Sequence, residues 1–244
     1  MKTVNRIFFR SLMLQATWNY EIMQGLGYLF SFYPHLEEVY KDEKELAAAC
    51  LRHLNYFNTH PYMVSFVLGE NARLENPDDA PISSSSDIST RFKLQMGGPL
   101  AALGDKLFWS TWRPICGLIA VLGIFLQLEP GWIVPLFFII MYNVPVIYFR
   151  YRGLKSSYTG RSELLDIIER VNSSLFLRYL PAAGLLAIAL CHIVVFLLFG
   201  MFSGVRLLVA TLVVVGLRNR CKVSSTSLLY IVALITFIGS MILR

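Results

Sequence analysis

Residues 97–114 read GGPLAALGDKLFWSTWRP, and they gather ionisable and aromatic groups at the edge of an apolar segment. Asp105 and Lys106 stand where loss of water makes charge costly, so such residues in a membrane are usually functional. The Asp105 carboxylate follows Gly104 and offers two acceptor oxygens. The glycines and Pro99 allow the backbone to turn and to approach its neighbours closely. This stretch is the first candidate for a binding site.

A second polar group lies in FNTHP, residues 57–61. Asn58 could bind a ligand hydroxyl, and His60 could titrate near neutral pH. Alternatively, Asn58 and Thr59 satisfy carbonyls at a helix end and His60 packs locally. For His60 the local packing role is favoured. For Asn58 both roles, hydroxyl binding and helix capping, stay open. Asn19 also lies in apolar company, which predicts that its amide is hydrogen-bonded.

Composition places these candidates in a membrane protein. Of 244 residues, 55% are hydrophobic and 16% charged, whereas soluble domains carry roughly a quarter charged residues. The net charge of +6 comes without the clustered basic patch of a nucleic-acid-binding surface, so no nucleic-acid partner is expected. The four cysteines lack metal-site spacing, and neither a metal nor a cofactor is expected. The N-terminus has no cleavable signal peptide pattern.

The elements that must position the candidates are helical. Apolar residues at steps of three or four predict one helix over 5–33, buried against protein or lying in the membrane interface. Asp42 with Glu45 resembles a capping box for a second helix, with a stripe of Leu46, Cys50, Leu54 and Phe57. A third helix is expected over 62–75. Residues 76–90 are rich in Ser, Asp and Pro and predict an exposed linker.

Five apolar segments follow, near 114–128, 131–149, 179–200, 204–217 and 226–243. The second, third and fifth approach the roughly 20 residues needed to span a bilayer, whereas the first and fourth are short. The expected fold is therefore all-α: a polytopic membrane protein with N-terminal amphipathic or re-entrant helices and about four to five C-terminal membrane segments.

Composition also divides the chain into regions. These are 1–75, amphipathic helices; 76–95, linker; 96–149, the Gly-Pro/Gly-Asp motif and first membrane hairpin; 150–178, a basic cytoplasmic loop; and 179–244, C-terminal membrane helices. Basic loops alternate with nearly neutral ones, which predicts a cytoplasmic N-terminus.

Three blocks in this order carry a family resemblance: MLQATWNYEIMQGLG (13–27), RHLNYFNTHPYM (52–63) and MGGPLAALGDKLFWSTWRPI (96–115). The chain resembles the IID membrane component of the mannose/fructose/sorbose family of the sugar phosphotransferase system. The resemblance covers residues 5–160 well.

The resemblance implies a non-catalytic subunit of a hexose permease in the bacterial cytoplasmic (inner) membrane, passing through it several times. Its partners would be a IIC membrane subunit, the IIB and IIA phosphocarriers, the hexose and the lipid bilayer, with a higher oligomer of IIC/IID pairs. Phosphorylation would be the work of IIB, so no catalytic residue is expected in this chain.

For the sugar, the resemblance implies a binding site built from both motifs. Its candidate residues are Asn19, Asn58, Gly98, Gly104, Asp105, Trp109 and Arg113. Asp105 would accept hydrogen bonds from hydroxyls, or it would cap a helix beginning at Lys106. Trp109 and Trp112 would face the sugar or, as favoured, form an interfacial belt. Arg113 would neutralise Asp105 or bind a phosphate-bearing partner.

A second function stays open. Lys106 replaces the usual Pro after the aspartate, Ala102 and Ser110 replace usual glycines, and the region 179–206 is shorter than in the family. These departures favour a divergent chain that no longer transports and serves as a membrane scaffold or sensor for phosphotransfer proteins.

Overall fold

The computed structural model describes residues 2–76 and 82–160, and some single residues between 189 and 216. Its elements are α1 (Lys2–Ser11), α2 (Gly25–Val39), α3 (Glu43–Leu54), α4 (Val64–Leu74), α5 (Ile82–Gly104), the π-helix η1 (Asp105–Trp112), α6 (Arg113–Phe125) and α7 (Ile133–Tyr158). In these described ranges β pairing is limited to two isolated bridges, Asn19 to Met23 and Met23 to Phe57. The prediction of a helical protein is confirmed.

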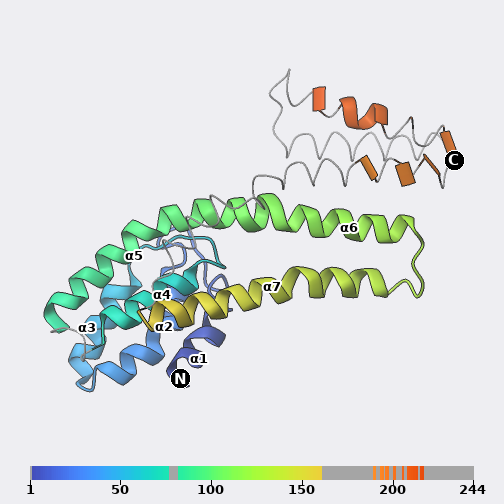
Figure 1. Cartoon of the computed structure of the whole chain (residues 1–244). Coiled ribbons are helices and arrows are strands. Elements are labelled where there is room, and N and C mark those ends of the chain that lie inside the picture. Colours follow the sequence, from blue (N-terminus) through green and yellow to red (C-terminus); the bar gives the residue numbers. More distant parts are fainter. Residues whose placement is uncertain are drawn as a thin grey trace.

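A long helical hairpin dominates the structure (Figure 1). Helices α5, η1 and α6 follow one another without a break, and α7 returns alongside them. Two of the described helices, Asp87–Ile124 and Ile133–Tyr158, are long and apolar enough to cross a membrane. At 1.5 Å per residue, the 26 residues of α7 measure about 39 Å, more than the roughly 30 Å of hydrocarbon in a bilayer. Helix α7 is therefore longer than the hydrocarbon layer is thick, and its last turns form one end of the hairpin.

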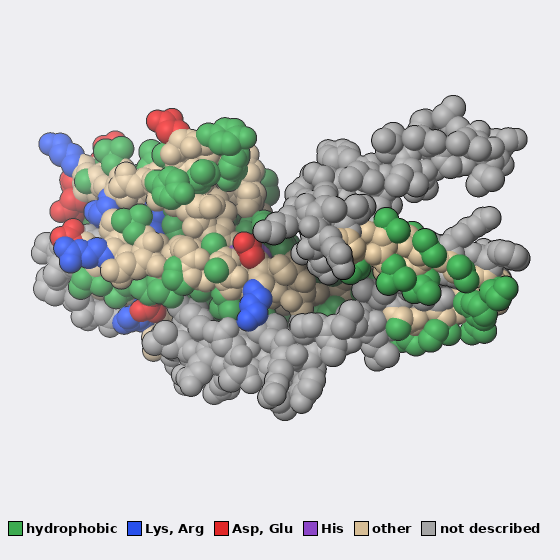
Figure 2. Space-filling model, turned by 90° about the horizontal axis from the view of Figure 1, so that it is seen from above, with side chains coloured by type: hydrophobic (Ala, Val, Ile, Leu, Met, Phe, Trp, Pro, Cys, Tyr) green, Lys and Arg blue, Asp and Glu red, His purple; other side chains and the backbone are tan. Residues whose placement is uncertain are grey.

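Helices α1 to α4 form a body around that end of the hairpin (Figure 1). Figure 2 shows charged side chains gathered on the body, while hydrophobic side chains cover the far part of the hairpin. Helix α4 packs against the last turns of α7, where Gly69 and Gly153 allow a close approach. A Cβ at Gly69 would lie 2.5 Å from the Leu154 carbonyl oxygen, and one at Gly153 would lie 2.6 Å from the Phe66 ring. This contact joins the body to the hairpin.

The core of the body is aromatic. Tyr28 and Phe32 from α2 pack with Phe57 and with Phe66 from α4, and all four side chains are fully or almost fully buried. The rings of Tyr28 and Phe57 meet edge to face with centroids 4.8 Å apart, an arrangement worth about 0.5–1.5 kcal/mol beyond area burial. Large rings thus hold together elements that are short on their own.

The single helix predicted for 5–33 is wrong: α1 ends at Ser11 and α2 begins at Gly25. Between them, the Asn19 side-chain oxygen accepts hydrogen bonds from the backbone N–H groups of Glu21 and Ile22. Met23 has a positive φ of 53°, which a helix does not allow. Local side-chain hydrogen bonds of this kind compete with helix formation, and the periodic pattern did not reveal them.

The second and third helices are confirmed. Asp42 caps α3 by accepting from the N–H groups of Lys44 and Glu45, at 3.0 and 3.1 Å. The buried face of α3 differs from the predicted stripe, because its buried side chains are Ala49 and His53. His53 faces inward because an acidic partner, described below, lies there.

The linker predicted for 76–95 differs from the structure over 82–95, which form the first turns of α5. Ser89 and Lys93 are buried there. The first apolar segment, at 114–128, is predicted to be short. In the structure it continues the helix formed by α5 and η1, and it is therefore part of a longer apolar helix. The basic loop predicted for 150–178 begins as the end of α7, and its residues from 161 lie outside the described part. So do most residues of the segment predicted at 179–200, some of those at 204–217, and all of 226–243.

Candidate functional site

The three sequence blocks meet at the extended segment 55–62. Gln24, from the first block, donates from its side-chain nitrogen to the Thr59 carbonyl at 2.7 Å and accepts from the Thr59 N–H at 3.0 Å. The Gln24 N–H also donates to the Phe57 carbonyl at 2.8 Å. These buried bonds satisfy the backbone of a segment that is neither helix nor sheet. The first block thus fixes the position of the second.

The third block packs on the other side of that segment. A Cβ at Gly104 would lie within 3.0 Å of three atoms of the His60 side chain, so only glycine fits there. The His60 ring stacks on Phe108 with centroids 5.5 Å apart and contacts Trp109 at 4.7 Å. Burial and, to a smaller extent, the charge of Arg150 lower the pKa of His60 to about 4. His60 is therefore a neutral residue that packs against its neighbours, which is the interpretation favoured from the sequence. Its packing partners, however, lie far along the chain and not next to it.

Asp105 lies inside a continuous helix, so the N-cap alternative is wrong. Residues 105–112 form a π-helix that continues α5 and leads directly into α6, and the position before it is Gly104, which has no side chain that could cap. π-helical turns inside α-helices are frequent at functional sites. The Asp105 side chain is exposed, which leaves its acceptor oxygens accessible to a partner or ligand.

Four of the five predicted residues of the third block lie on the exposed side of this long helix, whereas Gly104 is buried against His60. Gly98, Asp105, Trp109 and Arg113 are all exposed, and their steps of seven, four and four residues keep them on one face. We call these four residues the polar helix face. Trp109 combines an exposed surface with its contact to His60, so it belongs both to the packing and to this face.

A cavity of about 250 Å³ lies at one end of the polar helix face, between the extended segment and α5. It is lined by Tyr56, Phe57, Asn58, Lys93, Leu94, Gly97, Gly98 and Ala101. Pockets for drug-sized ligands measure about 300–1,000 Å³, so this one suits a smaller molecule. Asn58 and Gly98, predicted from two different blocks, are brought together here.

Lys93, which the sequence reading passed over, closes the inner wall of the cavity with a side chain that is only 1% exposed. Its ammonium group donates to the His53 carbonyl at 2.7 Å. It also lies 4.3 Å from the centre of the Tyr28 ring and 5.3 Å from that of Phe57. A cation at the C-terminus of α3 compensates the free carbonyls of that helix. Lys93 thus holds the wall that carries Asn58.

Glu75 is the buried acid behind this wall. It accepts hydrogen bonds from His53 at 2.7 Å, from Arg52 at 3.2 Å and from the Ser89 hydroxyl. Burial alone would raise the pKa of Glu75, but its hydrogen bonds from His53 and Ser89 and the Arg52 charge lower it to about 2. Burial also lowers the pKa of His53. An ionised Glu75 therefore ties α3 to α5.

Two predicted site residues have structural uses in the chain itself. Gly104 is buried against His60, and the Asn19 oxygen closes the turn before α2. Gln24, His53, Glu75 and Lys93 were missed as residues that shape the site. A helical period through Ser89, Lys93, Gly97 and Leu100 would have revealed α5 and its buried lysine, but the preceding run of serines obscured it.

Apolar helices long enough to span a bilayer, joined to a mostly helical body, define a helical membrane protein. The family model described as the PTS system mannose/fructose/sorbose family IID component matches residues 1–195. The chain belongs to this family. The resemblance noted in the sequence is therefore confirmed.

Individual proteins with similar sequences are also IID components. The mannose-specific EIID component of Escherichia coli (strain K12) is 30% identical over 186 residues, which are 76% of this chain and 64% of that protein. The fructose permease IID component of Bacillus subtilis (strain 168) is 31% identical over 165 residues, 68% of this chain and 59% of the relative. The chain thus spans about three fifths of the length of these relatives.

Two solved structures are similar over 99% of this chain and 95% of theirs. One is described as a membrane protein, with a TM-score of 0.70 and 25% identity. The other is the mannose transporter ManYZ in complex with microcin E492, with a TM-score of 0.59 and 27% identity. The fold of this chain is thus similar to that of two solved membrane proteins.

Proposed function

We propose that this chain is the IID-type membrane subunit of a hexose phosphotransferase permease. It pairs with a IIC chain to bind and translocate a sugar of the mannose/fructose/sorbose type, which a IIB partner phosphorylates. The observation that carries the proposal is the convergence of the three family blocks on one cavity and one exposed helix face. Membership of the family and the likeness to a mannose transporter support it.

In this proposal the sugar contacts come from the cavity and the polar helix face. The Asn58 amide and the Asp105 carboxylate receive hydroxyl groups, and Trp109 offers a flat apolar surface to the C–H side of the ring. Gly98 keeps the helix surface open, since no atom lies within 4 Å of a Cβ added there. Arg113 binds the negative charge of Asp105 or of a phosphate-bearing partner. Gly104 and Asn19 act through the positions they hold.

The assembly we propose is a higher oligomer of IIC/IID pairs in the bacterial cytoplasmic membrane, served by IIB and IIA phosphocarriers. The chain crosses the membrane several times, with the body of α1 to α4 in the cytoplasm. The exposed apolar side chains of α6 and α7, such as Ile124, Ile139 and Ile140, support a location among lipid and membrane partners.

The second candidate is a scaffold or sensor for phosphotransfer proteins that has lost transport. Lys106 favours it, because an exposed cation beside Asp105 competes for the carboxylate that hydroxyl groups would need. The same residue serves transport if it binds an anionic partner. The polar helix face is present in both candidates, so the test must measure sugar movement itself.

The experiment is uptake of radiolabelled mannose, fructose and sorbose by cells that lack their own hexose phosphotransferase permeases. The cells express this chain with its IIC, IIB and IIA partners, and the control omits only this chain. The proposal expects accumulation of sugar phosphate that depends on the chain. Assembly of the complex without uptake of any hexose would support the scaffold.

A further inference from the structure

We propose that the body has its own bilayer-binding surface, separate from the spanning hairpin. This surface, the α1–α2 patch, consists of Phe9, Leu12, Met13, Trp18, Tyr20 and Phe30. These side chains are between 41% and 86% exposed. They come from the end of α1, the turn that follows and the first half of α2. The occupant is the headgroup region of the membrane that the hairpin crosses.

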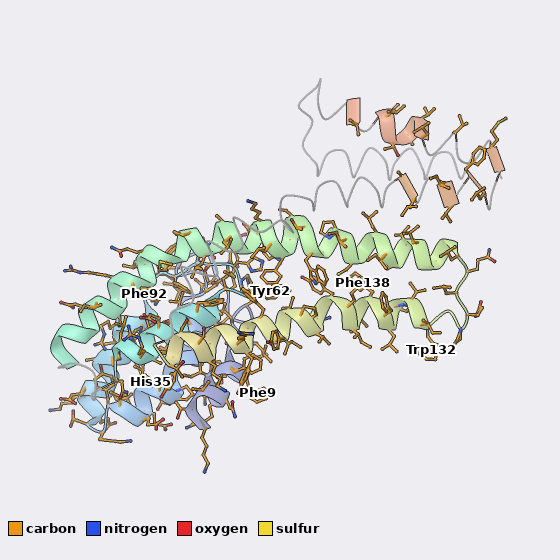
Figure 3. All side chains as sticks on the ribbon, in the orientation of Figure 1. Phe9, His35, Tyr62, Phe92, Trp132 and Phe138 are labelled. Carbon is orange, nitrogen blue, oxygen red and sulfur yellow. The ribbon has the colours of Figure 1, made fainter. Side chains whose placement is uncertain are left out.

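The α1–α2 pair is polarised from one end to the other. At the end away from the patch, Arg6 lies 3.3 Å from Glu37, and Thr3 donates a hydrogen bond to Glu38. At the patch end the exposed side chains are mostly apolar or aromatic. Figure 3 places the labelled Phe9 closer than His35 of α2 to the part of the hairpin that carries Phe138 and Trp132. The apolar end of the body therefore points along the hairpin toward its membrane part.

The patch is continuous with the surface of the hairpin. The Arg150 guanidinium donates to the Ser11 carbonyl at 2.6 Å, and the Phe8 ring packs edge to face on Tyr151 at 5.2 Å. On the loop side of Arg150, α7 exposes Ile147 and Tyr148, which belong to its apolar stretch. Ser11, the buried last residue of α1 between the patch residues Phe9 and Leu12, thus lies level with the place where α7 leaves the apolar region.

The residue types match the membrane interface. Tryptophan and tyrosine concentrate at the headgroup level because each ring is apolar and carries a polar tip, and Trp18 and Tyr20 meet edge to face at 4.8 Å. Arg10 lies against the patch residue Phe30, with its guanidinium 4.8 Å from the centre of that ring, where its charge can reach headgroup phosphates. Six large apolar side chains on one end exceed the scattered exposure normal for a surface.

The test places spin labels on the full chain, assembled with its membrane partner in liposomes. Single cysteines replace Met13 or Tyr20 in a background in which the four native cysteines are serine. Ala47, exposed on α3 at the polar end of the body, provides the control position. Electron paramagnetic resonance then compares relaxation by oxygen, which dissolves in lipid, with relaxation by a water-soluble nickel chelate.

The expected result is that oxygen relaxes the labels at 13 and 20 more than the nickel chelate does, with the reverse order at 47. Two results would overturn the proposal. Equal nickel access at 13, 20 and 47 would mean that the patch faces water. Loss of access to both reagents at 13 and 20, with 47 accessible, would mean that a protein subunit covers the patch.

Discussion

The side chain of His60 fills the space that any larger residue at position 104 would need, so Gly104 and His60 lock the extended segment under the long helix. The two residues come from motifs more than 40 positions apart in sequence. Their contact places Asn58 and the polar helix face on the same part of the molecule. The site therefore depends on a packing contact between residues that bind nothing themselves.

Gly104→Ala is expected to destabilise the assembled protein. The new methyl group has no room beside His60, and overpacking of this kind costs about 1–3 kcal/mol. The unfolding midpoint of the purified complex, measured by scanning fluorimetry, should fall. Gly98→Ala is the matched control, because that position is open and alanine favours a helix over glycine by about 1 kcal/mol. An equal loss in both variants would contradict the proposed contact.

Asp105→Asn should abolish or strongly reduce hexose uptake while the complex still assembles. The exposed carboxylate lies inside a continuous helix and not at a helix start, so the helix does not need its charge for capping. Hydrogen bonds to charged groups contribute about 1.5–3 kcal/mol, so sugar affinity should fall roughly ten- to hundredfold. Radiolabel uptake and the amount of complex in membranes are measured together. Full uptake would exclude Asp105 from sugar binding.

The stability of the body should decrease in acid because of His35. Its ring is buried beside Phe32 and Tyr158, and burial lowers its pKa from 6.5 to about 4. A depressed pKa means that the folded state resists protonation, so stability is complete above about pH 6.5 and is lost as the pH falls toward 4. The loss from this residue is at most about 3 kcal/mol.

His35→Phe should therefore reduce the acid sensitivity of the unfolding midpoint between pH 6.5 and 4. His53 and His60 retain their own contributions, since burial lowers their pKa values too. Phe32→Leu is the control: it loosens the same core without removing a titratable group, so it should lower the midpoint by a similar amount at every pH. An unchanged pH dependence in His35→Phe would refute this assignment.

The two ends of the hairpin should lie on opposite sides of the membrane. Glu129, in the loop between α6 and α7, and Lys155, near the end of α7, are both exposed. In a cysteine-free background, Glu129→Cys should react with a membrane-impermeant maleimide in intact cells. Lys155→Cys should react only after permeabilisation, because basic segments stay in the cytoplasm. Reaction of both positions from outside would show that the hairpin does not cross.

The sequence by itself determined the membrane class, the helices that begin at Asp42 and cover 62–75, and the family. Composition and apolar run length report burial in lipid directly, and the cap at Asp42 depends on residues only three positions apart. Asn58 and Gly98 were also found from their motifs, and the structure places both at the cavity.

Only the tertiary structure decided how these motifs meet. At the break between α1 and α2, the local turn at Asn19 is joined by pairing of Gln24 with Thr59, 35 residues away. The helix through 82–95 is accompanied by burial of Ser89 and Lys93 beside Glu75 and His53. Hydrogen bonds between distant residues overrule local periodicity, because a buried polar group must find its partner wherever the fold provides one. The sequence shows which polar residues need hydrogen-bond partners, and the packing of the helices determines which partners they find.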